Sequence, residues 1–390
     1  MEHLTSRFEE FARTIGAEIV SERDGRVVAS PRSTEEVAMV LQNAEANGFG
    51  VEIVGAGTKR RWAGAVRGDV VLETRGIAGV REHSWQDMTA TVGAGTTWME
   101  MQRVLAEHGQ MVALDPLWPE RATVGGVIAA NDSGAFRLRY GSLRDLVIGM
   151  TIVLADGTIA RSGGKVVKNV AGYDLHKLMI GAFGTLAVVT DATFRLHSIP
   201  RNSRTWSFES TDAVACGQML IKVLDSQLRV QAMQLRANAA GFALDVAIAS
   251  IDEVMREQWS LLDSLAGCAG AIPGDVFAAR ERLFTGNGVV AKVTMLASAI
   301  ARMSAEVVRL GGEAVTQASG IMVARLADAS TVDRLRELVA AEGVGAVTVL
   351  RGEDGYGVLP PGGDAGRLMR EIKRQFDGKG LLNPGVVIGG

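Results

Sequence analysis

The stretch over residues 123–134 constrains the fold most, because small residues are needed where a backbone approaches another group closely. It reads Thr-Val-Gly-Gly-Val-Ile-Ala-Ala-Asn-Asp-Ser-Gly, and Arg139-Tyr140-Gly141 follows shortly after. Gly125 and Gly126 lack a Cβ, so they can adopt a positive φ and leave their N–H groups open. Successive open N–H groups form a nest for an anion such as phosphate. The apolar run that follows predicts a buried helical turn, although a surface turn has a similar composition.

Three more blocks accompany this stretch. A predicted strand over residues 51–54 runs into the loop Gly55-Ala-Gly-Thr-Lys59, while residues 168–175 and 181–190 form two blocks downstream. In this order and spacing, the four blocks resemble the FAD-binding domain of the vanillyl-alcohol oxidase/p-cresol methylhydroxylase superfamily. The last two blocks are most similar to its branch with glycolate oxidase and D-lactate dehydrogenases. The resemblance covers about residues 30–200 and returns at residues 376–385.

The glycine loops do not match other nucleotide-binding signatures. After Gly55-Ala-Gly57 the third glycine of a dinucleotide fingerprint would be residue 60, which is Arg60, and after Gly93-Ala-Gly95 it would be Trp98. A Rossmann site needs that third glycine for close packing of helix on strand, so an NAD site is excluded. No phosphate-binding P-loop sequence is present. In the resembled superfamily, the backbone N–H groups of the first loop wrap the FAD diphosphate directly.

The resemblance implies a set of FAD-binding residues in the flavin domain. Lys59, Arg60 and Arg61 would add positive potential beside the two phosphates. Lys168, Asn169, Gly172 and Tyr173 match a segment expected near the flavin. The matched FAD-binding positions are Gly55, Ala56, Gly57, Thr58, Lys59, Pro116, Thr123, Gly125, Gly126, Asn131, Ser133, Gly134, Tyr140, Gly141 and Gly184.

Two of these positions carry alternatives. Tyr140 could equally be a core aromatic whose hydroxyl is satisfied, which is the usual situation of a buried tyrosine. Gly184 opens a turn that matches a Gly-Thr-Leu-Gly pattern, but Ala187 replaces its last glycine. A positive φ at Ala187 would be strained.

Cysteine and histidine positions bear on how the flavin is held. Neither Cys216 nor Cys268 lies in the first 200 residues, and the first glycine loop has no histidine. Because some superfamily members attach flavin through such residues, noncovalent FAD is expected here. Two cysteines also exclude a disulfide framework and a cysteine-ligated iron–sulfur cluster, and no metal site is predicted.

The length and charge of the chain limit the number of domains and the kinds of partner that we expect. A chain of 390 residues with 47% hydrophobic and 22% charged residues indicates a globular protein of two or three domains. A net charge of −3 gives no reason to expect a nucleic-acid partner. The N-terminus is not a signal peptide and no apolar run reaches the ~20 residues that span a bilayer, so we expect a cytoplasmic protein, with peripheral attachment to the inner membrane through partners as an option.

We expect an α+β fold: a p-cresol methylhydroxylase-type FAD-binding domain of two α/β subdomains over residues 1–200, and a smaller ferredoxin-like α+β domain over residues 201–375. Residues 376–390 are expected to return towards the flavin domain. The second domain is predicted from strands at 228–235, 242–249, 289–297, 320–326 and 344–351 and helices at 251–265, 298–310, 330–341 and 364–376. No internal repeat is evident.

The histidine distribution points to a role. All five histidines lie at or before residue 197. Catalytic members of the resembled branch carry a histidine-rich metal and base motif in the substrate domain, and nothing in residues 201–390 resembles it. Oxidising a 2-hydroxy acid needs a base for the hydroxyl proton, and histidine suits that role. The chain therefore resembles the FAD-binding E subunits of glycolate oxidase, which act beside a larger catalytic flavin subunit and an iron–sulfur subunit to oxidise glycolate to glyoxylate.

Two alternatives stay open. The chain could be a self-sufficient flavoenzyme for a small hydroxy acid or alcohol, with Tyr140 or Tyr173 as the base. It could also be a scaffold that has kept the fold and lost the flavin. No catalytic residue is identified from the sequence.

Overall fold

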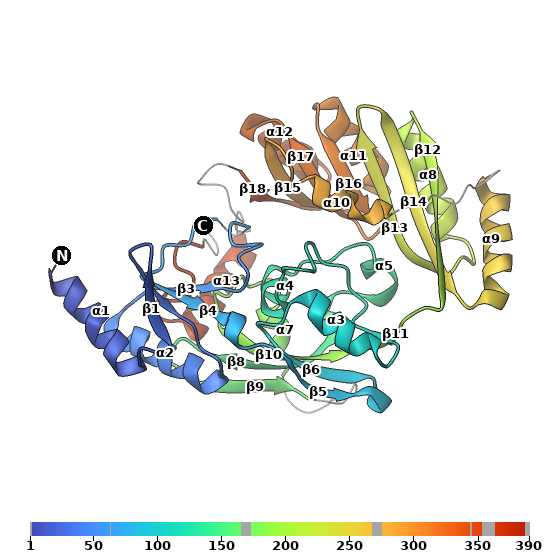
Figure 1. The fold of residues 1–390 in the computed structure, drawn as a ribbon. Coiled ribbons are helices and arrows are strands. Elements are labelled where there is room, and N and C mark those ends of the chain that lie inside the picture. Colours follow the sequence, from blue (N-terminus) through green and yellow to red (C-terminus); the bar gives the residue numbers. More distant parts are fainter. Residues whose placement is uncertain are drawn as a thin grey trace. The chain divides into compact units, whose positions relative to one another are not determined.

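The computed structural model describes residues 2–62, 64–164, 173–266, 275–343, 345–352 and 363–386. It divides the chain into two compact units (Figure 1). The first unit comprises Met1–Asp132, Ser142–Ser198 and Gly357–Gly390, and the second comprises Ser133–Gly141 and Ile199–Tyr356. The chain therefore enters the second unit twice: first with the short segment Ser133–Gly141, and again at Ile199.

The first unit begins with a four-stranded sheet in the order β1 (Val20–Arg23), β2 (Arg26–Ala29), β4 (Val70–Glu73) and β3 (Val51–Val54). Strands β2 and β3 run parallel to β4. Helix α2 (Thr34–Asn47) begins after Ser33, whose hydroxyl accepts the Glu36 N–H, and ends at Gly48 with a φ of 65°. Its buried residues Val37, Val40 and Leu41 share a core with the sheet and α1 (Glu2–Ile15).

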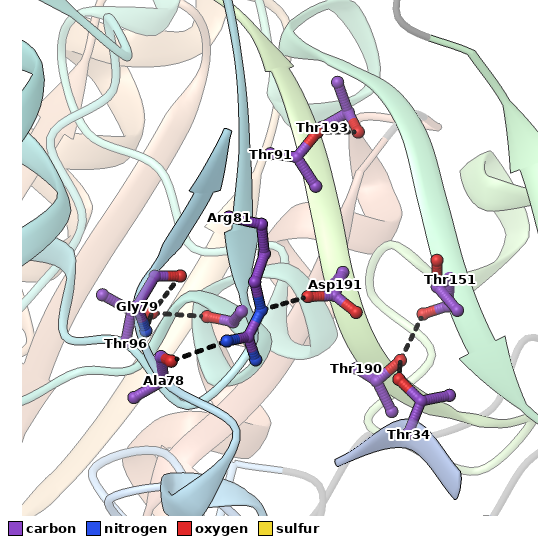
Figure 2. Close-up of polar contacts among 11 residues, drawn as sticks. Thr34, Ala78, Gly79, Arg81, Thr91, Thr96, Thr151, Thr190, Asp191 and Thr193 are labelled. Atoms are coloured by element: carbon purple, nitrogen blue, oxygen red, sulfur yellow. Dashed lines mark hydrogen bonds and ion pairs between the residues drawn. The ribbon is translucent and has the colours of Figure 1, made fainter. Parts of the chain in front are cut away.

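A second sheet of the same unit is antiparallel, in the order β5 (Val80–Ser84), β6 (Thr89–Gly93), β10 (Val188–Arg195), β8 (Val147–Val153) and β9 (Ile159–Gly163). Polar pairs tie its strands together: Arg81 bonds Asp191 at 3.1 Å, and the hydroxyls of Thr91 and Thr193 lie 2.9 Å apart (Figure 2). Helices α3 (Trp98–Ala106), α4 (Val124–Ala130), α6 (Leu143–Leu146) and α7 (His176–Met179) contribute to its core. A two-stranded pair, β7 (Gln110–Met111) and β11 (His197–Ser198), completes the unit.

The second unit contains one seven-stranded antiparallel sheet. Its order is β12 (Asn202–Ser210), β14 (Gly241–Ser250), β13 (Val230–Asn238), β16 (Glu313–Gln317), β17 (Ile321–Leu326), β15 (Val289–Thr294) and β18 (Ala346–Arg351). Helices α8 (Ala213–Leu224), α9 (Asp252–Ala266), α11 (Ile300–Arg309) and α12 (Ala329–Ala341) share two cores with one face of this sheet. Short helices α5 (Arg137–Tyr140) and α10 (Ala279–Arg282) also belong to this unit.

The expected α+β class is confirmed, and the second unit doubles the ferredoxin-like motif. Chain order gives β12-α8-β13-β14-α9 and then β15-α11-β16-β17-α12, completed by β18. Equivalent strands β13 and β16 pair antiparallel, so the two repeats share one sheet. The repeat is not evident from the sequence, because the predicted elements do not include β12, α8 and β16. Strand β12 lies at an edge and is largely polar, which weakens its hydrophobic pattern.

Helix α13 (Gly363–Phe376) belongs to the first unit, whereas the sequence analysis grouped it with the second domain. Its Lys373 donates hydrogen bonds to the carbonyls of Thr185 at 2.6 Å and Leu382 at 3.2 Å. Asp377, which is buried, accepts the N–H groups of Leu381 and Leu382. The bond between Lys373 and Thr185 joins residues 188 positions apart and ties the C-terminal segment to the rest of the first unit, which local patterns cannot reveal.

Candidate functional site

A pocket of about 80 Å³ lies in the first unit, at the end of β3. A buried water occupies roughly 10–15 Å³ of such space, so the pocket has room for a phosphate-sized group rather than for a whole dinucleotide. Its walls come from four segments: β3 and the loop after it, α4, the turn after α7 and the C-terminal segment. The lining residues are Glu52, Ile53, Val54, Gly55, Ala56, Gly57, Thr58, Lys59, Arg60, Val66, Thr123, Gly126, Ala129, Ala130, Phe183, Asn383 and Val386.

The first glycine loop presents open backbone donors to this pocket. Gly57 has a φ of 72°, a conformation that glycine adopts without strain. The N–H groups of Ala56, Gly57 and Thr58 make no hydrogen bond to any other residue that the structure describes. A Cβ on Gly55 would lie 2.3 Å from the Thr123 Oγ1, so the loop can approach α4 only with glycine there. Consecutive open N–H groups beside a small pocket suit a diphosphate.

The second glycine segment differs from the expectation. Gly125 and Gly126 lie inside α4 and neither has a positive φ. The Gly125 N–H donates to the Ala94 carbonyl at 2.8 Å, and the Gly126 N–H donates to Thr123 Oγ1 at 3.3 Å. The predicted nest of open N–H groups at these two glycines is therefore wrong, although the predicted helix is present. A Cβ on Gly125 would lie 3.0 Å from the Ala94 Cβ, so glycine permits close packing there.

Two of the three basic residues of the first loop, Lys59 and Arg60, form ion pairs within the protein. Lys59 lies 3.3 Å from Asp132, and both side chains are almost wholly buried. Arg60 pairs with the buried carboxylate of Glu52, to which Arg26 also bonds at 2.7 Å. The expectation that Lys59, Arg60 and Arg61 add positive potential beside the phosphates stays a prediction, although Lys59 and Arg60 have carboxylate partners within the protein. Lys59 is thus balanced by one carboxylate, whereas Arg60 shares its carboxylate with Arg26.

The C-terminal segment completes the pocket. The side chain of Asn383 accepts the Ile53 N–H at 2.7 Å and donates to the Phe183 carbonyl at 2.6 Å. Leu382 lies beside Val51 as a parallel bridge, so the segment extends the sheet at β3. Sequence reasoning omitted Asn383, Phe183 and Val386 from the site. The Asn-Pro-Gly pattern at residues 383–385 was the one signal that could have indicated them.

The other predicted positions are distributed between the units. Pro116, Asn131 and Gly184 belong to the first unit, whereas Ser133, Gly134, Tyr140 and Gly141 belong to the second. The Oδ1 atom of Asn131 is buried without a hydrogen-bond partner among the described residues, which is what a ligand donor would satisfy. The binding roles of all these residues stay predictions.

Gly184 and the residues around it show why the turn tolerates an alanine. Gly184 has a φ of 68°, and a Cβ there would lie 2.8 Å from Asn383 Nδ2. Ala187 has no positive φ, so the strain expected at Ala187 is absent.

Within the second unit, the short segment Ser133–Gly141 is held by long-range bonds. The Ser133 carbonyl accepts the Gln317 amide at 2.9 Å and also bonds the buried Arg280. Tyr140 packs against Phe136, with ring centroids 5.9 Å apart, and Arg139 lies over its ring. Tyr140 is half-buried and has these ring contacts, and the choice between a flavin contact and a core aromatic stays open.

Candidate acid–base groups are few. Burial lowers the pKa of His176, whose Nδ1 lies 3.1 Å from the Ser162 hydroxyl, so its imidazole is neutral at pH 7. Burial raises the pKa of the Cys216 thiol to about 11, which makes that thiol unreactive. Tyr173 is 89% exposed, and Lys168, Asn169 and Gly172 lie outside the described residues. No group of three or more potential metal ligands occurs in the part of the chain that the structure describes.

Comparison with known proteins finds relatives of the first unit. Residues 25–163 match the family described as "FAD binding domain". The chain is 37% identical over 180 residues to mitochondrial D-lactate dehydrogenase [cytochrome] of Arabidopsis thaliana, covering 45% of this chain and 31% of the relative. It is 36% identical over 193 residues to glycolate oxidase subunit GlcD of Bacillus subtilis, covering 48% and 41%. It is 37% identical over 133 residues to glycolate oxidase subunit GlcE of Escherichia coli, covering 34% and 38%.

The chain thus spans well under half the length of these relatives. Solved structures match it more completely. Substrate-bound p-cresol methylhydroxylase aligns with a TM-score of 0.75 over 99% of this chain and 96% of that chain, at 15% identity. Alkyldihydroxyacetonephosphate synthase aligns with a TM-score of 0.75 over 97% and 84%, at 16% identity. At these identities the likeness establishes the fold. No helix in the described ranges is long and apolar enough to cross a membrane.

Proposed function

We propose that this chain is a noncovalent FAD-binding subunit of a glycolate oxidase complex, a proposal supported by the match of residues 25–163 to the family described as "FAD binding domain". In this role it carries flavin and relays electrons beside a larger catalytic flavin subunit and an iron–sulfur subunit, while the complex oxidises glycolate to glyoxylate. The single observation that carries the FAD assignment is the row of open N–H groups at Ala56, Gly57 and Thr58 beside the pocket.

The chemistry of the site fits the flavin cofactor. Bound FAD would supply a reversible acceptor for electrons, and the protein residues would bind and orient it. The first glycine loop would hold the diphosphate through its N–H groups, and the buried Asn131 Oδ1 offers an unused acceptor. Asn383 would keep the end of β3 and the turn at Phe183 in place around the ligand.

The subunit role rests on two further points. The relatives include both GlcD and GlcE subunits of glycolate oxidase, at similar identity. Residues 201–390 contain no histidine, so the second unit lacks the residue best suited to accept a hydroxyl proton near neutral pH. Similarity to D-lactate dehydrogenases supports the rival proposal, a self-sufficient 2-hydroxy-acid dehydrogenase.

The mode of flavin binding can be tested directly. We expect the purified chain to be yellow, and acid precipitation to release all the colour into the supernatant. The reason is that neither cysteine lies in the first 200 residues and the first glycine loop has no histidine that could bond the flavin covalently. Colour that stays in the pellet would contradict this expectation. A colourless chain that cannot take up added FAD would favour the flavin-free scaffold.

The isolated chain should oxidise glycolate far more slowly than its complex. A correctly placed base contributes roughly 10²–10⁴-fold, and the second unit has no histidine to supply one. Stopped-flow absorbance with glycolate would measure the rate of flavin bleaching, with dithionite as the control that the flavin is reducible. Rapid bleaching by glycolate would promote the self-sufficient dehydrogenase. Isolation from the native host should also recover a larger flavoprotein and a cysteine-rich iron–sulfur protein.

A further inference from the structure

A buried ion pair lies directly behind the first glycine loop. Lys59 and Asp132 are 8% and 4% exposed, and their Nζ and Oδ2 atoms are 3.3 Å apart. Both groups also bind the backbone of Leu117: Asp132 accepts its N–H at 2.7 Å and Lys59 donates to its carbonyl at 3.2 Å. The three residues therefore form a closed polar network inside the first unit.

Two tryptophans enclose the ammonium group. The Lys59 Nζ lies 5.5 Å from the ring centroid of Trp62 and 5.3 Å from that of Trp118, within the range of cation–π attraction. The two rings are 6.2 Å apart at an interplanar angle of 60°. Aromatic faces, a carbonyl and a carboxylate thus already compensate the charge of Lys59, so that charge is not a spare one for a phosphate.

The network connects two walls of the pocket. Lys59 directly follows Ala56, Gly57 and Thr58, whose N–H groups are open. Asp132 lies two residues after α4, the helix that contributes Gly126 and Ala130 to the lining. Breaking such a pair on one side is costly, because it leaves a buried charge without compensation. Neutralising both partners is much less disruptive.

We propose that Asp132 is a positioning residue, which acts through Lys59 to hold the open N–H groups of the first glycine loop in the arrangement that binds the FAD diphosphate. This inference rests on the proposed FAD binding. The rival explanation is that Lys59 turns towards the phosphates and that Asp132 merely competes for it. The two explanations predict opposite signs for one substitution.

The test uses Asp132→Asn, Lys59→Met and the double variant of the full chain, each stripped of flavin and titrated with FAD by fluorescence quenching. Asp132→Asn keeps an acceptor for the Leu117 N–H and removes only the charge. If the pair positions the loop, each single variant weakens FAD binding by at least about tenfold, and the double variant recovers most of that loss. If Lys59 serves the phosphates directly, Asp132→Asn tightens FAD binding and the double variant stays as weak as Lys59→Met; either result overturns the proposal.

A matched control and a ligand-free readout complete the design. Asp191→Asn removes a carboxylate from the ion pair with Arg81, at 3.1 Å in the second sheet (Figure 2), and should leave FAD affinity unchanged. Amide hydrogen exchange of the apoprotein should rise over residues 55–62 in Asp132→Asn and stay near wild type in the double variant; unchanged exchange in Asp132→Asn overturns the proposal. If Asp132→Asn does not fold, the FAD affinity of the double variant is compared with that of Lys59→Met. A higher affinity in the double variant supports the positioning role, and an equal affinity overturns it. A wild-type chain unable to bind FAD would refute the proposed function, while the exchange experiment would still test the pair.

Discussion

Replacing Gly55 by alanine should lower FAD affinity by about 100-fold, because the new Cβ would lie 2.3 Å from the Thr123 Oγ1. Thr123 caps α4 by accepting the Gly126 N–H, and it would have to leave that position. Losing a cap costs about 1 kcal/mol and overpacking adds about 1–3 kcal/mol, which together approach two orders of magnitude in affinity. Fluorescence titration of the apoprotein with FAD measures the change.

The matched control is Gly25→Ala in the turn between β1 and β2. Gly25 has a φ of 69°, and its Cβ would meet nothing within 4 Å. Alanine there costs about 1–2 kcal/mol of backbone strain, so it should lower the Tm while leaving FAD affinity unchanged. Wild-type FAD affinity in Gly55→Ala would show that the pocket at β3 is not the diphosphate site.

Replacing Asn383 by alanine should weaken FAD binding by about 30-fold. The substitution leaves the Ile53 N–H and the Phe183 carbonyl without the partners they have in the structure. Each unsatisfied buried group costs about 1–3 kcal/mol, and part of that cost appears as displacement of the two pocket walls that Asn383 joins. Isothermal titration calorimetry with FAD, together with thermal unfolding of the apoprotein, separates lost affinity from lost stability.

Asn238→Ala is the comparison variant for this experiment. Its side chain accepts the Ala240 N–H in the exposed turn between β13 and β14, so it offers the same chemistry at a site outside the pocket. FAD affinity should be unchanged in that variant. If Asn383→Ala retained wild-type FAD affinity, the C-terminal segment would be a structural strap without a role in the ligand site.

Local sequence patterns were sufficient where the physical cause is itself local. The helical turn over α4 follows from hydrogen bonding and backbone freedom within a few residues. The glycine loop after β3 was found for the same reason, because small residues beside a strand end signal a close approach.

The sequence was less informative where the cause is a distant contact. Gly125 was read as a donor to an anion, yet its N–H binds Ala94, thirty-one positions earlier. The sequence predicts that Lys59 adds positive potential beside the phosphates, and only the tertiary structure shows that its ammonium group pairs with Asp132. A residue type shows what a side chain can do, while the choice among several possible partners depends on which segments pack together.

The sequence by itself determined the α+β class, the glycine loop and the absence of histidine from residues 201–390, because each is a property of residue types in order. The tertiary structure decided which N–H groups stay open, how the charges of Lys59 and Arg60 are balanced, and that Asn383 closes the pocket. It also decided that two similar repeats share one sheet in the second unit. The physical reason is that hydrogen bonds and ion pairs between distant segments form only once folding has brought those segments together, and no local pattern in the chain specifies them.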